Sequence, residues 1–296
     1  MTARTLLWTI LASLIPLAVT ATAQDPSTGL VVAGTAQAEL GANILEEDND
    51  ESTDEIDDQT YPFLAGAGAI SIPVLDAFSV QADLSGEYNF TSSSEHDNLT
   101  GDLLMGGHAS WRNPDVGLLG LFGGYGRGWN EDTDKQDESS LGWLGVEGQA
   151  YFGPATLYLQ TAYVNGEIEN TEENFNPAFL LRGVGRYFPT EDQRVELELS
   201  YTRADEVIDD SDDMWGIGWG IRYDRRLIGG LHAFASYRGA FYDTTTEGEE
   251  LTEHIPSIGL TFLFGAESLM ANDRRGATLD QPRIAMRTTN WAQPLD

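Results

Sequence analysis

The amino-acid sequence predicts an all-β protein whose strands close into an antiparallel transmembrane β-barrel of about 12 strands, with long loops at one end and short turns at the other. Three observations predict this fold. Apolar and polar residues alternate within short segments, the connections between these segments are alternately long and short, and acidic residues concentrate in the long connections. Strands with this pattern turn an apolar face to lipid and a polar face to the inside of a barrel.

The chain begins with the pattern of a removable signal peptide. Arg4 gives a positive start, an apolar run extends over residues 6–19, and Ala21-Thr22-Ala23 forms a small-x-small cleavage pattern. The run is too short to span a bilayer comfortably, so it predicts export of the chain rather than a membrane anchor. Cleavage after Ala23 would leave a mature chain that begins at Gln24.

Composition excludes several classes of function. The 296 residues include 48 Asp and Glu against 16 Lys and Arg, a formal net charge of −32. We therefore expect no nucleic-acid partner, since phosphate binding needs clustered basic residues. The absence of cysteine excludes disulfides and thiolate metal sites. No stretch after the signal peptide is apolar enough for a transmembrane helix, so a mature chain in a membrane must be a barrel.

Alternation with a period of two predicts each strand. In the clearest segment, Trp215, Ile217 and Trp219 share one face, while Gly216 and Gly218 lie on the other. A helix would scramble these two faces, whereas a strand keeps them apart. The same test along the chain predicts strands over 29–41, 61–74, 77–91, 99–112, 117–129, 141–152, 155–165, 176–188, 194–204, 214–224, 231–243 and 254–264.

The connections alternate strictly in length. Short ones carry turn residues, among them Asn113-Pro114-Asp115, Gly153-Pro154 and the segment 224–230. An even number of strands with this alternation places both ends of the barrel on the side of the short turns. The long connections cover residues 42–60, 92–98, 130–140, 166–175, 205–213 and 244–253.

Charge follows loop length, because most of the 48 acidic residues lie in the long connections. The run from Asp48 to Ser52 superficially resembles an EF-hand calcium loop. However, Thr53 stands where that loop has glycine, and Gln59 replaces its closing Glu. We therefore expect no cofactor and no specific metal site, with Ca²⁺ or Mg²⁺ bound only loosely at the acidic loops.

Aromatic residues recur toward strand ends, as in the girdles that mark the two membrane interfaces. The last predicted strand itself ends in Phe262-Leu263-Phe264. The predicted girdle residues are Tyr88, Phe90, Trp111, Phe152, Tyr187, Tyr201, Trp215, Tyr223 and Phe241.

Together, the signal peptide, the alternating strands, the asymmetric connections and the aromatic-ended final strand resemble those of porin-like outer-membrane β-barrel proteins of Gram-negative bacteria. The resemblance covers nearly the whole mature chain, but it is a likeness of pattern and transfers no substrate or catalytic residue. It implies location in the outer membrane, contacts with outer-membrane lipid and lipopolysaccharide, and insertion by the barrel assembly machinery.

The chain departs from this family because it continues beyond the final strand. We expect three parts: a signal peptide over 1–23, an outer-membrane barrel over 24–265 and a periplasmic C-terminal tail over 266–296. The tail is nearly charge-balanced. It could bind peptidoglycan, plug the barrel or hang free, and a free terminus is the default expectation.

The alternation of inward and outward positions along each strand predicts a charged lumen. An outward Arg at the bilayer midplane would cost about 2–4 kcal/mol, which favours inward positions for strand arginines. The turn near Thr190 places Arg186 opposite Glu196, and we predict an ion pair between them. The predicted lumen-lining charged residues are Glu39, Asp83, Glu87, Asp102, Arg112, Glu147, Arg182, Arg186, Glu196, Glu198, Arg222 and Arg238.

Two interpretations of this lumen stay open. The inward acids and arginines could pair and fill a structural barrel, or they could line a narrow water-filled pore. A barrel of about 8 strands is filled by side chains and one of about 16 leaves a channel, so size does not decide. Small inward residues such as Gly216, Gly218 and Ser200 favour the pore. Acidic mouths would make it a porin-like diffusion pore that prefers small cations.

Two other functions are kept as alternatives. The acidic surface loops could act in adhesion on a filled barrel. A lipid hydrolase would need a nucleophile, and His108-Ala109-Ser110 is a candidate pair with Asp102 on the same strand. Outer-membrane lipid A deacylases carry such a pair facing lipid, whereas parity turns His108 and Ser110 inward, so we expect no enzyme. The sequence indicates no oligomeric state.

Overall fold

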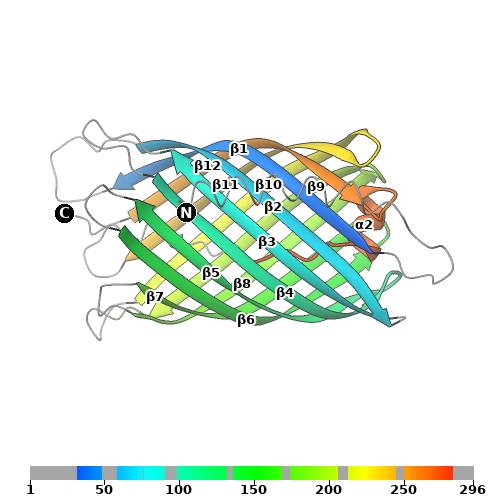
Figure 1. Ribbon diagram of the computed structural model, residues 1–296, viewed down its shortest axis with the longest axis horizontal. Coiled ribbons are helices and arrows are strands. Elements are labelled where there is room, and N and C mark those ends of the chain that lie inside the picture. Colours follow the sequence, from blue (N-terminus) through cyan, green and yellow to red (C-terminus); the bar gives the residue numbers. More distant parts are fainter. Residues whose placement is uncertain are drawn as a thin grey trace.

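The computed structural model describes residues 32–48, 59–75, 77–90, 99–131, 136–168, 174–205, 213–244 and 250–282. Within them the protein forms one closed antiparallel barrel of twelve strands, which confirms the predicted fold class (Figure 1). Each strand pairs with its sequence neighbours, and β1 pairs with β12. The elements are β1 (Ala33–Asp48), β2 (Gln59–Leu75), β3 (Phe78–Phe90), β4 (Leu99–Asn113), β5 (Gly117–Glu131), β6 (Gln136–Phe152), β7 (Ala155–Ile168), β8 (Asn174–Thr190), β9 (Gln193–Asp205), β10 (Asp213–Ile228), β11 (Leu231–Thr244), β12 (Glu250–Phe264) and the helix α2 (Leu269–Arg275).

Eleven of the twelve strands are longer than predicted, and β3 is the exception, because it covers Phe78–Phe90 where 77–91 was predicted. β3 has 13 residues and β2 has 17, whereas about 9–11 residues of tilted strand cross a bilayer. β1 continues to Asp48 and β5 to Glu131, into segments predicted as loops. The sequence patterns ended these strands early because acidic residues do not suit a lipid-facing position, but strand ends beyond the apolar belt meet water instead.

The turn between β10 and β11 is also shorter than predicted. The segment 224–230 was expected to be a turn, but strand pairing continues to Ile228 and Leu231 and leaves only Gly229 and Gly230. Gly229 has a φ of 54°, a backbone conformation that glycine adopts without strain. Asp224 is consequently a strand residue whose side chain is buried inside the barrel.

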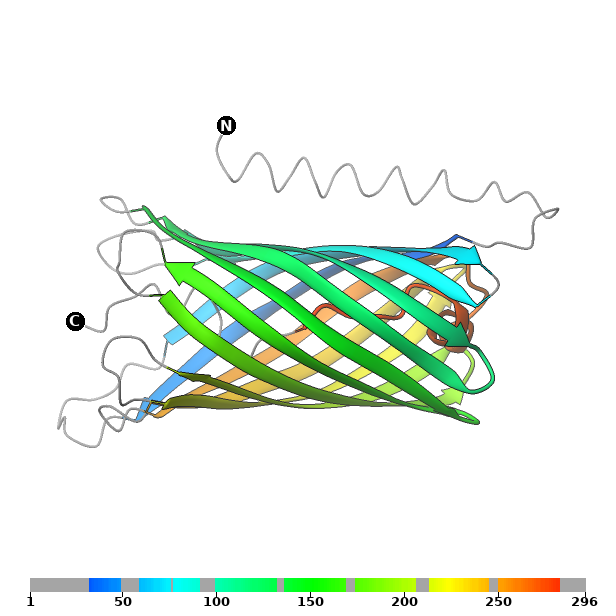
Figure 2. The same cartoon turned by 90° about the horizontal axis from the view of Figure 1, so that it is seen from below.

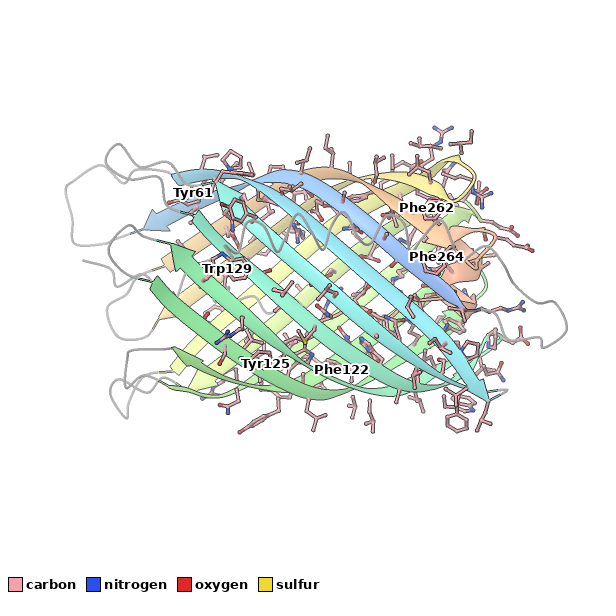
Figure 3. The ribbon with its side chains drawn as sticks, in the orientation of Figure 1. Tyr61, Phe122, Tyr125, Trp129, Phe262 and Phe264 are labelled. Carbon is pink, nitrogen blue, oxygen red and sulfur yellow. The ribbon has the colours of Figure 1, made fainter. Side chains whose placement is uncertain are left out.

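The outer face of the barrel is apolar. Leu144, Leu119 and Ile258 project outward with 71%, 66% and 64% of their surface exposed. On β5, Phe122 points inward and is buried, whereas Tyr125 points outward and is exposed (Figure 3). A continuous apolar surface of this kind is unfavourable in water and favourable in lipid.

Aromatic side chains lie near both ends of the strands, as the girdle pattern predicts. Trp129 lies toward one end of the barrel and Phe262 toward the other (Figure 3). Phe152 and Tyr187 are exposed near the short turns. Tyr88 was predicted to belong to the girdle, but it is buried and packs edge-on against Phe90 with ring centroids 5.1 Å apart.

The chain after β12 turns back into the barrel. Gly265, with a φ of 71°, makes the reversal possible, and α2 then lies at the end of the barrel that carries the short turns (Figure 1). Residues 276–282, which follow α2, run along the inside of the barrel (Figure 2). We call residues Leu269–Pro282 the C-terminal plug. Of the three placements left open for the tail, the default of a free terminus is wrong for these residues, because buried arginines on the wall bind them.

Some predicted features lie outside the described residues. They include the signal peptide over 1–23, most of the acidic loop segments and the last part of the tail, 283–296. In the described part of the chain, no helix combines the length and apolar character needed to cross a membrane.

We predict that the outer face contacts lipid in a depth-dependent way. Leu144 lies in the middle of β6 and Phe152 at its end. Leu144→Arg should lower the free energy of unfolding by about 2–4 kcal/mol and Phe152→Arg by about 0–1 kcal/mol, because the cost of an outward Arg falls from midplane to interface. Urea titration of the barrel refolded into lipid vesicles measures both values. Equal effects at the two positions would contradict a lipid-facing belt.

Candidate functional site

The lumen of the barrel holds the predicted charged residues. The structure places all twelve on inward-facing positions, and eight of them line a cavity of about 340 Å³ beside the plug: Glu39, Asp83, Glu87, Asp102, Glu196, Glu198, Arg222 and Arg238. The other four, Arg112, Glu147, Arg182 and Arg186, are buried on β4, β6 and β8 and do not line the cavity. Three of these four bind the plug directly.

Arg186 makes the most hydrogen bonds of these four residues. Its Nε donates to Glu196 Oε2 at 2.9 Å, so the predicted cross-strand ion pair is present. The guanidinium also binds two carboxylates of the plug, Asp273 at 3.0 Å and Asp280 at 2.7 Å. A buried guanidinium needs such partners, because an unpaired charge in the interior is costly.

Neighbouring wall residues hold the rest of the plug. Arg112 donates to the carbonyl oxygen of Gly276 at 2.7 Å, and Thr156 donates to Asp273 at 2.6 Å. Arg182 contacts the Asp280 carboxylate at 3.3 Å and Glu198 at 2.7 Å. The plug therefore docks by side-chain hydrogen bonds and ion pairs along its whole described length.

The helix α2 fixes the start of the plug. Ser268 caps it by accepting a hydrogen bond from Ala271 N at 3.0 Å. Leu269 packs with Phe188 and Leu263 in a small apolar cluster. Arg274 donates to the carbonyl oxygen of Gly153 at 2.8 Å. Met270 N also donates to the carbonyl oxygen of Glu191 at 3.1 Å, so the helix is tied to two of the short turns and to the end of β12.

A second charged cluster surrounds His108. Its Nε2 lies 2.7 Å from Asp83 and its Nδ1 lies 2.8 Å from Glu147, with the His108 and Glu147 side chains fully enclosed. Tyr158 also donates to Glu147, at 2.6 Å. Both ring nitrogens of His108 therefore contact carboxylates. The imidazole links Asp83 of β3 and Glu147 of β6 to its own strand, β4.

The candidate nucleophile Ser110 does not join this cluster. Its hydroxyl oxygen lies 3.0 Å from that of Ser79. Among the contacts of the described residues, none links His108 to Ser110, so the structure does not assemble the pair that a lipid hydrolase would require.

A third network lies on β1 and β9–β12. Arg222 and Arg194 both bind Asp224, at 2.7 Å and 3.0 Å. Arg238 binds Glu39 at 3.0 Å, and Ser257 donates to the same carboxylate at 2.6 Å. The guanidinium of Arg222 also lies 3.7 Å from the ring centre of Phe234, a cation–π contact.

The lumen also contains an apolar layer that the sequence patterns did not predict. Trp143, Leu180 and Tyr242 belong to a buried cluster formed by residues of β5–β8 and β11. These residues share inward faces with charged ones, so parity places them inside, but only their contact across the barrel shows that they pack together. The layer narrows the space available beside the plug.

The cavity that remains is strongly acidic. Nine carboxylate side chains and three guanidinium groups line it. Four of these charged residues were not among the predicted ones: Arg194, Asp224, Glu253 and Asp280. Asp224 and Glu253 were assigned to connections, Arg194 sat at a predicted strand start, and Asp280 belongs to the tail. Nothing in the period-two pattern places a tail residue inside a barrel.

No group of three or more His, Asp or Glu side chains close enough to hold a metal ion occurs in the part of the chain that the structure describes. The run predicted to resemble a calcium loop lies almost entirely outside the described residues, as do most acidic loop segments. Loosely bound Ca²⁺ or Mg²⁺ at these loops stays a prediction.

No protein-family model and no curated protein matches the chain. The fold is similar to that of an outer-membrane channel from Pseudomonas putida F1, with a TM-score of 0.56 and 9% identity over 83% of this chain and 98% of that one. It is also similar to the translocator domain of the autotransporter NalP from Neisseria meningitidis, with a TM-score of 0.50 and 13% identity over 79% of this chain and 88% of that one. The chain therefore has the fold of outer-membrane β-barrels.

We predict that the His108 cluster stabilises the barrel. His108→Ala should lower the free energy of unfolding by about 3–5 kcal/mol, because it leaves enclosed carboxylates facing each other without their cation. His254→Ala is the matched control: His254 is partly exposed and lies 3.8 Å from Glu46, so its loss should cost less than about 1 kcal/mol. Urea denaturation followed by tryptophan fluorescence measures both, and similar costs would refute the stabilising role.

Proposed function

We propose that the protein is a narrow diffusion channel of the outer membrane that prefers small cations. The observation that carries this proposal is the luminal cavity beside the plug, with its nine carboxylates against three guanidinium groups. A confined space lined mainly by one sign of charge concentrates counter-ions and repels ions of the same sign. Small cations are therefore the solutes that this lumen suits best.

The plug contributes to this charge balance. Arg112, Arg182 and Arg186 are covered by the plug and are 8%, 1% and 2% exposed. The three therefore face plug atoms instead of the cavity. Arg194, Arg222 and Arg238 do line the cavity, but each is bound to a carboxylate of the wall. In this way the plug narrows the lumen and leaves it more acidic than the arginine content of the strands suggests.

Location in the outer membrane is part of the proposal. The apolar outer face supports it, and so does the fold shared with outer-membrane β-barrels, one of which is described as a channel. In that location the outer face would contact lipid, the acidic loops would meet lipopolysaccharide at the cell surface, and the short turns would face the periplasm. Insertion would require the barrel assembly machinery.

A filled structural barrel that acts through its surface loops is the second candidate. The observation that favours it is the combined filling of the lumen by the plug and by the apolar layer around Trp143 and Tyr242. The two candidates differ in conductance, since a filled barrel passes no ions whereas a channel does.

We predict that the purified, full-length protein conducts ions in planar lipid bilayers. With a KCl gradient across the bilayer, the reversal potential should have the sign of a cation-preferring pore, because carboxylates dominate the cavity. An absence of single-channel steps would refute the channel and favour the filled barrel. A reversal potential of the opposite sign would refute the electrostatic argument while leaving a channel in place.

Paired substitutions should locate the source of the selectivity. Glu87 and Asp102 face each other on β3 and β4 and both line the cavity. The variant Glu87→Gln with Asp102→Asn should shift the reversal potential toward zero, since it removes two negative charges from the wall. Asp115→Asn, in an exposed turn, is the matched control and should leave the reversal potential unchanged. An equal shift in both variants would show that the cavity does not set the preference.

A further inference from the structure

We propose that the inner wall formed by β3, β5, β7 and β8 is a binding site for extended peptides in which an apolar residue precedes an acidic one, and that Leu279 and Asp280 of the plug are its resident ligand. The proposal goes beyond ion conduction and does not depend on it. It rests on how completely the wall recognises these two residues, including their side chains and both of their peptide groups.

The wall recognises Leu279 by an apolar pocket and a polar clamp. The Leu279 side chain packs with Leu118, Tyr158 and Val184, all of which are nearly inaccessible to solvent. The Gln81 amide binds the backbone of the same residue on both sides: Nε2 donates to the carbonyl oxygen at 2.6 Å, and Oε1 accepts from Leu279 N at 3.3 Å. One side chain thus reproduces the two hydrogen bonds that a neighbouring β-strand would provide.

The wall recognises Asp280 by two arginines and two neutral groups. Arg186 Nη2 lies 2.7 Å and Arg182 Nη2 lies 3.3 Å from the Asp280 carboxylate. Gln160 donates to the Asp280 carbonyl oxygen at 2.8 Å, and Asp280 N donates to the Tyr158 hydroxyl at 3.4 Å. Paired guanidinium groups are the arrangement that proteins use to select carboxylates.

The charge state of Asp280 agrees with this geometry. Enclosure within the barrel raises the pKa of the Asp280 carboxyl, but the guanidinium groups of Arg186 and Arg182 outweigh that effect and hold the pKa below its ordinary value. The wall therefore binds the ionised form of the residue.

The site is built without the plug. Arg182 is held by Glu198 at 2.7 Å and by Gln160 at 2.8 Å, and Arg186 is held by Glu196 at 2.9 Å. All five residues lie on β7, β8 and β9, whose register is set by the closed sheet. An empty site would keep its shape, and without Asp273 and Asp280 it would have lost two negative charges and would favour an acidic ligand.

The contacts define the class of ligand. Both peptide groups are bound, so a simple organic acid would use only the arginine pair. The apolar pocket lies one residue before the carboxylate, so a peptide of the reverse order would place its acid against Leu118 and Val184. The predicted ligand is a short extended peptide whose sequence resembles that of Gly276–Pro282.

The test measures peptide binding directly and needs no conduction. A fluorescently labelled peptide with the sequence of Gly276–Pro282 is titrated with detergent-solubilised barrel, and its anisotropy is recorded. Full-length protein carrying Leu279→Ser and Asp280→Asn, which weakens the resident plug, should bind the peptide. The wild-type chain should not bind it, because its own plug fills the site.

Matched peptides and wall variants test the recognition. A peptide with Asn in place of Asp should bind at least about tenfold more weakly, a difference of about 1.4 kcal/mol. Adding Arg182→Gln and Arg186→Gln to the plug-weakened protein should abolish binding, whereas adding Arg225→Gln, at an exposed position, should not. Succinate should fail to displace the peptide at matched concentration.

Different outcomes would overturn the proposed specificity and the proposed site itself. Equal affinity for the Asp and Asn peptides, or displacement by succinate as effective as by unlabelled peptide, would overturn the proposed specificity. If the weakened plug still occupies the wall, full-length protein that also carries Asp273→Asn and Thr278→Ala gives the deciding measurement, with folding checked by heat-modifiable migration. Failure of the Asp peptide to bind that folded barrel would overturn the proposal, whether or not the protein conducts ions.

Discussion

Pairing between β1 and β12 is the constraint on which the rest of the structure depends. It closes the sheet, so that every strand has two neighbours and no edge is left with unpaired backbone groups. Closure divides the side chains into two sets. The outward set is apolar because it can face lipid, and the inward set is enclosed in a limited volume where each charge must find a partner.

The enclosed volume explains why the tail folds inward. β8 brings Arg182 and Arg186 into the lumen four residues apart on the same face, and β9 supplies Glu198 and Glu196 as their first partners. Both guanidinium groups have further donors, and the plug satisfies them with Asp273 and Asp280. Gly265 permits the chain reversal that brings these acids to the wall. The same docking covers the arginines, so the cavity that remains beside the plug is lined mainly by carboxylates.

Much of the site follows from the period of two. The inward position of the twelve predicted charges, and the meeting of Arg186 with Glu196 across the β8–β9 turn, need only parity and turn length. The same rule predicts strands that end too early. β10 continues past Asp224, a residue type that is common in turns. The rule also does not reveal which inward residues meet across the barrel, and so the apolar layer of Trp143, Leu180 and Tyr242 was not foreseen.

The sequence by itself determined the class of fold, the number of strands, the orientation of most side chains and the separation of acidic loops from short turns. These properties depend on the alternation of apolar and polar residues and on the lengths of the connections, and both can be read from consecutive residues. Only the tertiary structure decided the state of the lumen. Whether Asp280 meets Arg186, and whether His108 meets Asp83 and Glu147, depends on distances across a closed barrel between residues far apart in the chain. Such distances are set by closure of the sheet, which no local pattern encodes.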